Sequence, residues 1–186
     1  MEELRKERGA GPVSGFTAMI CIRGAGTLIK VGMAQFRVAV APARMMTFAL
    51  GSCVGIVLYD PVSKIGGLAH VMHPNSERVG NNANRAKFVD TAVELMLSRM
   101  AKKGAMRIRI EAKIFGGAKM FQSVKASPGV MQIGAENVNA TKEELTKRNI
   151  PIVAESTGGT KGKTVLFDVT SGRVTVKDAQ NKEEKF

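Results

Sequence analysis

The chain has 186 residues, a net charge of +12 at pH 7, and 44% hydrophobic residues. This length suits one domain, and the balance of apolar and charged residues excludes a disordered or fibrous protein. The excess of Lys and Arg indicates an acidic partner, while one Tyr and no Trp argue against a groove for single-stranded nucleic acid.

The N-terminal part of the chain predicts an extension followed by strands. Residues 1–27 mix charge, Gly and Pro without a regular period, and we interpret them as a poorly ordered extension. Residues 28–40 carry enough β-branched side chains for one or two short strands, and residues 45–50 resume an extended pattern. From residue 51 to 74 the chain is apolar on both sides of Asp60, which predicts a buried hairpin.

Two helices and a strand are predicted in the middle of the chain. Apolar residues recur at helical spacing from 88 to 100, and they alternate with polar residues from 106 to 114, which predicts a half-buried strand. A second helix is predicted from about residue 135 or 139 to 148, with Thr141 and Glu144 spaced as a capping box.

The remaining elements are mostly strands. We predict a short helical stretch after residue 118, a turn at 127–129, strands at 150–155, 163–169 and 173–177, and a polar tail at 178–186 that frays. Two glycine-rich segments, 116–117 and 158–162, lack the spacing of phosphate loops and are interpreted as turns.

The two cysteines, Cys21 and Cys53, are too few for a disulfide framework, and no Cys or His cluster has zinc-ligand spacing. The apolar run from Phe16 to Ile22 is too short to span a bilayer and makes a poor signal peptide. We therefore expect a cytoplasmic protein with reduced thiols, no membrane insertion, no metal and no nucleic-acid partner.

Cys53 follows Gly51 and Ser52, a setting typical of a nucleophile, because small residues allow a sharp turn that leaves backbone N–H groups free. A thiol needs a base to become a thiolate, and His70, on the second strand of the hairpin, is the candidate. The commoner alternatives for such residues are a buried structural cysteine and a satisfied core histidine.

Seven short motifs follow one another along the chain: Leu50–Val54, Tyr59-Asp60, Gly67–Met72 with Pro74, Ile114–Ala118, Ile133-Gly134 before Asn137-Val138, Gly158-Gly159, and Phe167-Asp168 with Ser171-Gly172. Their order and spacing over residues 31–177 resemble the CheD family of chemoreceptor glutamine deamidases. The resemblance implies a hydrolase that converts selected glutamine side chains of methyl-accepting chemotaxis receptors to glutamate and releases ammonia.

The resemblance also implies the site. Its catalytic set corresponds to Cys53, His70 and Thr47, where Thr47 supports the histidine; a Thr before a strand would otherwise be interpreted only as a strand former. The predicted substrate-binding or oxyanion residues are Gly51, Ser52, Phe115, Gly116 and Gly117. No cofactor is implied.

The implied fold is a single-domain, layered α/β sandwich with a mixed, largely antiparallel β core over residues 28–177, similar to deamidating toxins of the cytotoxic necrotizing factor type. The implied partners are the receptors and a CheC-type phosphatase, whose binding competes with receptor deamidation. Two other functions stay open: a non-catalytic adaptor that docks a CheC-type phosphatase or a receptor helix, and a general cysteine protease.

The sequence departs from the family pattern at two places. His73 stands where the family commonly has an apolar residue, which could alter the proton balance near the site. Residues 160–163 replace a more basic segment. Lys161 and Lys163 keep positive charge there, and we predict that they help to capture an acidic substrate.

Overall fold

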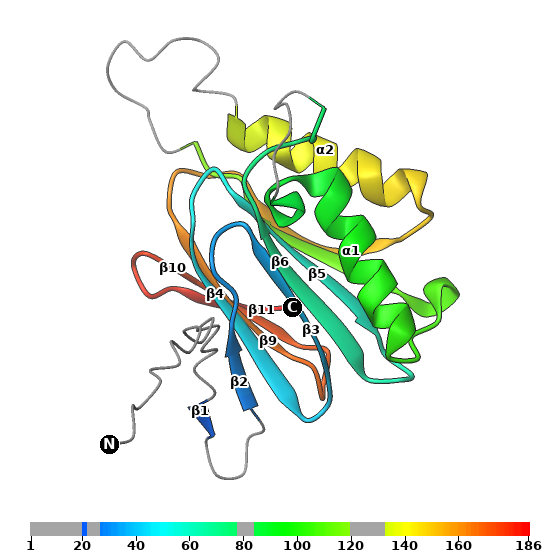
Figure 1. Ribbon diagram of the computed structural model, residues 1–186. Coiled ribbons are helices and arrows are strands. Elements are labelled where there is room, and N and C mark those ends of the chain that lie inside the picture. The colour runs from blue at the N-terminus through cyan, green and yellow to red at the C-terminus, as the bar shows by residue number, and fades with distance from the viewer. Residues whose placement is uncertain (1–19, 22–26, 78–83, 120–132) are drawn as a thin grey trace, which may run out of the picture.

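A computed structural model describes residues 20–21, 27–77, 84–119 and 133–186. These residues form two sheets stacked face to face, with helices over one of them (Figure 1). We call the sheet that carries the helices the central sheet and the other the outer sheet. Most of the predicted extension, the predicted turn at 127–129 and nearly all of the short helical stretch after residue 118 lie outside the described residues.

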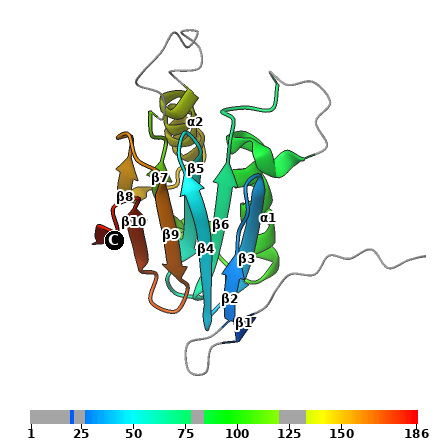
Figure 2. The same cartoon turned by 90° about the vertical axis from the view of Figure 1, so that its left-hand side faces the viewer.

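The outer sheet has the strand order β1-β2-β4-β9-β10-β11. Its strands are β1 (Ile20–Cys21), β2 (Thr27–Lys30), β4 (Ala43–Leu50), β9 (Lys163–Asp168), β10 (Val174–Asp178) and β11 (Glu183–Lys185). All neighbours pair antiparallel except β2 and β4. Figure 2 shows this sheet from the side on which β4 and β9 lie in front.

The central sheet has the order β3-β6-β5-β7-β8. Its strands are β3 (Gln35–Val40), β6 (Ile65–Val71), β5 (Val54–Asp60), β7 (Glu111–Gly116) and β8 (Ile152–Thr157). Only β7 and β8 pair in parallel. The expected layered α/β sandwich with a mixed, largely antiparallel β core is confirmed.

The described chain has two α-helices, α1 (Val89–Lys102) and α2 (Ile133–Lys147). They lie side by side on the face of the central sheet that points away from the outer sheet (Figure 1). Short 3-10 turns, η1 (Arg85–Lys87) and η2 (Arg107–Arg109), flank α1. The helix predicted from residue 88 is confirmed. Gly104, with φ +101°, follows its last turn as a glycine C-cap does.

Strand alternation divides the buried residues into two cores. Val54, Ile56 and Leu58 of β5 pack toward the helices, whereas Val57 and Tyr59 pack between the two sheets. By the same alternation, His70 shares the inter-sheet face of β6 with Leu68, which belongs to the second core.

Thr47 shares the inward face of β4 with Met45, another member of that core. Thr47 therefore points toward the central sheet from the outer one, just as His70 points toward the outer sheet from the central one. The alternation of two strands from different sheets thus directs two polar side chains into one apolar layer.

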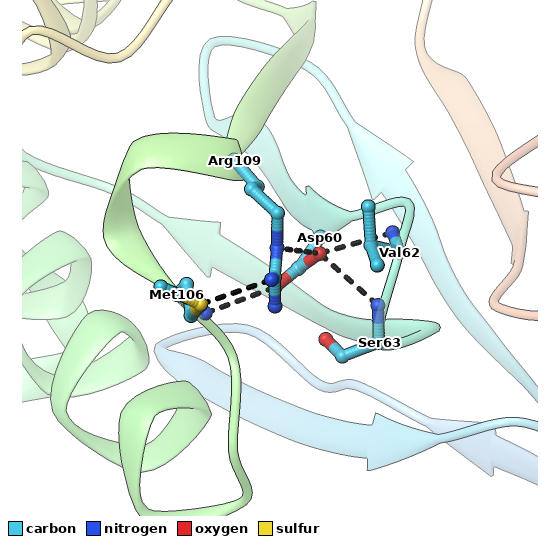
Figure 3. Close-up of polar contacts among 5 residues, drawn as sticks. All are labelled: Asp60, Val62, Ser63, Met106 and Arg109. Atoms are coloured by element: carbon cyan, nitrogen blue, oxygen red, sulfur yellow. Dashed lines mark hydrogen bonds and ion pairs between the residues drawn. The ribbon is translucent and has the colours of Figure 1, made fainter.

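The predicted hairpin is confirmed as β5 and β6, in register from Val54 opposite Val71 to Asp60 opposite Ile65. Asp60 is fully buried, and its carboxylate accepts hydrogen bonds from the backbone N–H groups of Val62, Ser63 and Met106 (Figure 3). The Arg109 guanidinium pairs with the same carboxylate at 2.8 Å.

Burial alone would raise the pKa of Asp60. The hydrogen bonds from Arg109 and from the backbone outweigh burial and hold this pKa well below its usual value. The charged carboxylate therefore ties the hairpin turn to the segment that precedes β7.

That carboxylate also explains why the predicted strand at 106–114 is wrong before residue 111. The Met106 N–H and the Arg109 side chain both bind Asp60, so residues 107–109 turn back as η2 instead of extending. Met106 and Ile108, expected on the buried face of that strand, are 53% and 88% exposed. Apolar and polar residues alternate over 106–110 as in a strand, but residues 107–109 form a 3-10 turn.

Two further expectations are corrected. Thr141 and Glu144 are not a capping box, since α2 begins at Ile133 and the Thr141 hydroxyl donates to the Asn137 carbonyl within the helix. The fraying predicted for the tail is also wrong, because β11 pairs with β10 and the Phe186 ring lies 5.4 Å from that of Phe115. One terminal aromatic side chain supplies the apolar contact that orders this polar segment.

Candidate active site

Cys53 lies in the bend between β4 and β5 and is partly buried. β4 reaches this bend through a bulge, with the register to β9 shifting between Thr47 and Leu50 and Ala49 at φ +56°. A bulge re-aims a strand and its following loop. Here it turns the chain from the buried Thr47 into the bend that carries Cys53.

The end of β7 is pressed against this bend. The carbonyls of Gly51 and Cys53 accept hydrogen bonds from the backbone N–H groups of Ala118 (2.7 Å) and Gly117 (2.8 Å). A Cβ on Gly116, which has φ +98°, would lie 2.5 Å from the Cys53 carbonyl oxygen. Glycine at 116 is therefore required by both the backbone conformation and the close approach.

His70 is 2% exposed, and its Nδ1 lies 2.8 Å from the Thr47 hydroxyl, a hydrogen bond that joins the two sheets. Its neighbour across the β5–β6 ladder is Gly55, and the space that a side chain at Gly55 would take is filled by Leu50, whose Cδ1 lies 2.8 Å from the position of a Cβ there. Nε2 of the same ring is buried and has no hydrogen-bond partner among the described residues. Thr47 thus holds one ring nitrogen and leaves the other available.

The register brings Cys53 toward this imidazole. Cys53 is two residues before Gly55, so both residues belong to the inter-sheet side of the chain, and Cys53 packs against the inter-sheet core. If the β5–β6 register is extended by one residue past Val54, Cys53 falls diagonal to His70 on this face. The hairpin register thus agrees with the prediction that the thiol and the imidazole lie at the same end of β5 and β6.

Burial sets the protonation of both groups. It lowers the pKa of His70 to about 4, so the imidazole is neutral at pH 7. It raises the pKa of the Cys53 thiol, an effect that the backbone hydrogen bond of Cys53 itself only partly offsets. In the free protein both the Cys53 thiol and the His70 imidazole are therefore neutral at pH 7.

The other predicted site residues divide into two groups. Gly51 and Ser52 form the bend with Cys53, and within the described residues no backbone carbonyl accepts a bond from the N–H of Ser52 or Cys53. At the end of β7, by contrast, the Gly117 N–H is committed to the Cys53 carbonyl and the Phe115 ring lies in the inter-sheet core. The end of β7 thus holds the bend in place through backbone hydrogen bonds.

One residue of the site was given no role by sequence reasoning. Asn137 on α2 is fully buried, and its Nδ2 donates to the carbonyls of Ser52 and Met72, each at 3.0 Å. The only signal in the sequence was its place in a family motif. Contacts across 85 and 65 residues leave no local pattern.

The two lysines expected to help capture a substrate both contact other residues of the protein. Lys163 Nζ donates to the carbonyl and hydroxyl of Ser156 at 2.6 and 3.0 Å, and burial lowers its pKa. Lys161 pairs with Asp178 at 3.7 Å. Both lysines thus have partners within the protein, and their role in substrate capture stays a prediction.

His73 lies away from the imidazole of His70. It follows β6 by two residues after Val71, on the helix-facing side, and its ring lies 5.8 Å from that of Phe88. Burial, followed by the charge of Lys87, lowers the pKa of His73. A neutral His73 beside Phe88 can fill the place of the apolar residue that the family commonly has.

Comparisons with known proteins identify the family of this chain. The model of the CheD family, described as CheD chemotactic sensory transduction, matches residues 72–178. The chain therefore belongs to the CheD family.

Two relatives carry the name "Probable chemoreceptor glutamine deamidase CheD". The one from Caldanaerobacter subterraneus subsp. tengcongensis is 49% identical over 81% of this chain and 92% of its own length. The one from Pyrococcus abyssi is 46% identical over 80% and 90%. Almost the whole of each relative thus corresponds to this chain.

Solved structures give a more distant match. A Neisseria meningitidis protein of the DUF152 family aligns with 8% identity and a TM-score of 0.43, covering 67% of this chain and 53% of its own. The likeness to toxins of the cytotoxic necrotizing factor type stays a prediction. No helix in the described part of the chain is long and apolar enough to cross a membrane.

Proposed function

We propose that this protein is a chemoreceptor glutamine deamidase that uses Cys53 as nucleophile, His70 as base and Thr47 to orient the histidine. The names of its relatives support the reaction, glutamine side chains to glutamate with release of ammonia. The observation that carries the residue assignment is the buried contact between Thr47 and His70, together with the packing of Cys53 against the inter-sheet core. The deamidase unit, predicted as residues 28–177, contains all three residues.

The reaction begins with the neutral pair. In the productive tautomer, Nδ1–H of His70 donates to the Thr47 hydroxyl, and the lone pair on Nε2 accepts the proton of the Cys53 thiol. The sulfur then attacks the carbonyl carbon of the glutamine side chain. The backbone N–H groups of Ser52 and Cys53 face the negative oxygen that develops.

Collapse of this tetrahedral intermediate breaks the carbon–nitrogen bond. His70 Nε2–H gives its proton to the departing nitrogen, so ammonia leaves and a thioester to Cys53 remains. Water then adds to the thioester with Nε2 again as base, and the thiol leaves. The net change is glutamine plus water to glutamate plus ammonia, with the enzyme regenerated.

The test is incubation with a cytoplasmic fragment of a chemoreceptor, followed by ammonia assay and mass spectrometry. We expect a gain of about one dalton per modified glutamine and its loss in Cys53→Ala, because this change removes the proposed nucleophile. The matched control is Cys21→Ala, which removes the second cysteine and should retain activity. Binding of the fragment without any mass gain would favour the adaptor function.

Two finer statements belong to the same proposal. We propose that the protein acts in the cytoplasm, where the modified regions of receptors lie. We also propose that a CheC-type phosphatase binds it, an assignment supported by the family alone. A purified CheC-type protein should then slow receptor deamidation in proportion to complex formed, and unchanged rates at saturating complex would contradict this.

A further inference from the structure

Asn137 contacts both chain segments that carry the catalytic pair. Ser52, whose carbonyl it binds, immediately precedes Cys53, and Met72, whose carbonyl it also binds, follows His70 by two residues. These carbonyls come from the β4–β5 bend and from the end of β6. A single amide on α2 therefore fixes the distance between the nucleophile bend and the strand of the base.

Close packing of α2 makes this contact possible. A Cβ on Gly134 would lie 2.8 Å from the carbonyl oxygens of Gly117 and Ala118, so only glycine lets the first turn of the helix approach the β7 end. Asn137 follows three residues later on the same face of the helix. The helix is thus seated where a side chain of this length reaches the bend.

The orientation of the amide is determined by its partners. Both contacts are backbone carbonyls, which only accept hydrogen bonds, so the group that meets them must be the donating Nδ2. Oδ1 is buried and has no hydrogen-bond partner among the described residues. An acceptor in the place of Nδ2 would face two carbonyl oxygens with no proton to share.

The bond to Ser52 has a consequence one atom further along the chain. The peptide unit is planar and trans, so the carbonyl of Ser52 and the N–H of Cys53 point in opposite directions from one rigid group. Whatever holds the Ser52 oxygen therefore also aims the Cys53 N–H. Asn137 holds that oxygen toward the helix layer, and the N–H consequently faces away from α2.

We propose that Asn137 is a positioning residue that locks the Ser52–Cys53 peptide so that the Cys53 N–H receives the oxyanion of the tetrahedral intermediate. The inference rests on the proposed function for the nature of the substrate. Asn137 acts from α2 through the Ser52 carbonyl, without touching the substrate or the reacting atoms. Its effect is specific to steps in which a carbonyl oxygen becomes negative.

This specificity separates positioning from general support. Acylation of Cys53 by an amide or an ester passes through an oxyanion, whereas alkylation by iodoacetamide displaces iodide at a saturated carbon and forms none. Loss of a single oxyanion donor lowers turnover by about 100- to 1,000-fold in hydrolases. Alkylation requires only the thiolate and access to it.

The experiment compares three rates in the full-length protein: deamidation of a receptor fragment, acylation of Cys53 by p-nitrophenyl acetate, and alkylation by iodoacetamide. The variant is Asn137→Asp, which keeps the shape of the side chain but replaces the donor. Thr141→Val is the matched control, since Thr141 lies one turn later on α2, is equally buried, and loses only its bond to the Asn137 carbonyl. Asn137→Ala replaces Asn137→Asp if the latter does not fold.

We expect deamidation and acylation to fall together by about 100-fold or more in the Asn137 variant, with alkylation changed less than about threefold and Thr141→Val near the unsubstituted protein. Equal loss of alkylation and acylation would overturn the inference, as would equal losses in Thr141→Val or full activity in Asn137→Ala. Acylation without receptor deamidation in the unsubstituted protein would refute the proposed function while the ester rates still decide the role of Asn137. Absence of both acylations would refute both.

Discussion

The hydroxyl of Thr47 and the imidazole of His70 meet 2.8 Å apart, with both side chains withdrawn from solvent. We predict that Thr47→Val lowers kcat by about 10- to 100-fold, because it keeps the shape but frees the ring and its tautomer. Thr47→Ser, which keeps the hydroxyl, should retain most of the turnover in the same ammonia assay. Equal losses in the two variants would assign the methyl group, not the hydroxyl, the decisive role.

The protonation of the catalytic pair gives a second prediction. Burial lowers the pKa of His70 to about 4 and raises that of Cys53 from 9.0, so neither group is charged at pH 7 in the free protein. The ultraviolet absorbance of a thiolate, measured as the difference between the protein and its Cys53→Ser variant, should be absent at pH 7 and emerge only above about pH 9. A thiolate band at neutral pH would reveal an ion pair with imidazolium instead.

Individual residues of the site differ in how far the sequence could predict them. Cys53 and His70 could be proposed from local signals, because two small residues precede Cys53 and the predicted hairpin links Cys53 to His70. Thr47 came only from the family resemblance, because a threonine in a strand is ordinary. Asn137 had no local signal at all, as its partners lie in segments that only folding brings to α2.

At the scale of elements, the accuracy of sequence periodicity depended on what competed with it. The hairpin of β5 and β6 and the helix α1 form where their sequence patterns predict them. The segment before β7 alternates as a strand would, yet it forms η2, because Asp60 supplies a charged acceptor that binds its backbone and Arg109. The contacts of the buried Asp60 carboxylate thus outweighed the strand-like alternation of this segment.

We therefore predict that Asp60→Asn destabilises the fold by about 2–3 kcal/mol, somewhat less than the full cost of breaking a buried pair because Arg109 is partly exposed. The folded pKa of Asp60 is depressed, so its contribution is present above about pH 4 and is lost as pH falls below that value. The difference in the free energy of unfolding between the unsubstituted protein and Asp60→Asn, measured in urea, should therefore become smaller as the pH falls below about 4.

The matched control for this pair is Glu94→Gln, since Glu94 forms an ion pair with Arg85 in which both side chains are more than half exposed. That change should cost less than about 1 kcal/mol. Asp60 lies at the far end of β5 from Cys53, roughly 20 Å away for a strand of this length. Turnover per folded Asp60→Asn molecule that fell tenfold would contradict a purely structural role.

At the scale of the whole molecule, the sandwich brings together residues from both sheets and from the helix layer. Thr47 comes from the outer sheet, His70 from the central sheet and Asn137 from α2. The layered α/β class was expected from the family resemblance, whereas the contact between Thr47 and His70 across the two sheets depends on strand register and on the bulge in β4. Those features arise from long-range packing, which periodicity does not encode.

The net charge of +12 is also a property of the whole molecule. If a receptor fragment is acidic, kcat/KM should fall as salt shortens the Debye length from about 10 Å at 0.1 M to about 3 Å at 1 M, while kcat stays nearly constant. Stopped-flow or steady-state ammonia release over this range measures both. A kcat/KM that does not respond to salt would assign the charge to solubility alone.

The covalent step is the central claim, and one measurement addresses it directly. The protein is mixed with a receptor fragment, quenched in acid within a turnover, and analysed by intact mass and peptide mapping. We predict a covalent adduct at Cys53. Its mass should equal the summed masses of the protein and the receptor fragment minus that of ammonia, which is about 17 daltons. Full deamidation by Cys53→Ala, with no adduct in the unsubstituted protein, would contradict the thioester mechanism and the assignment of its nucleophile.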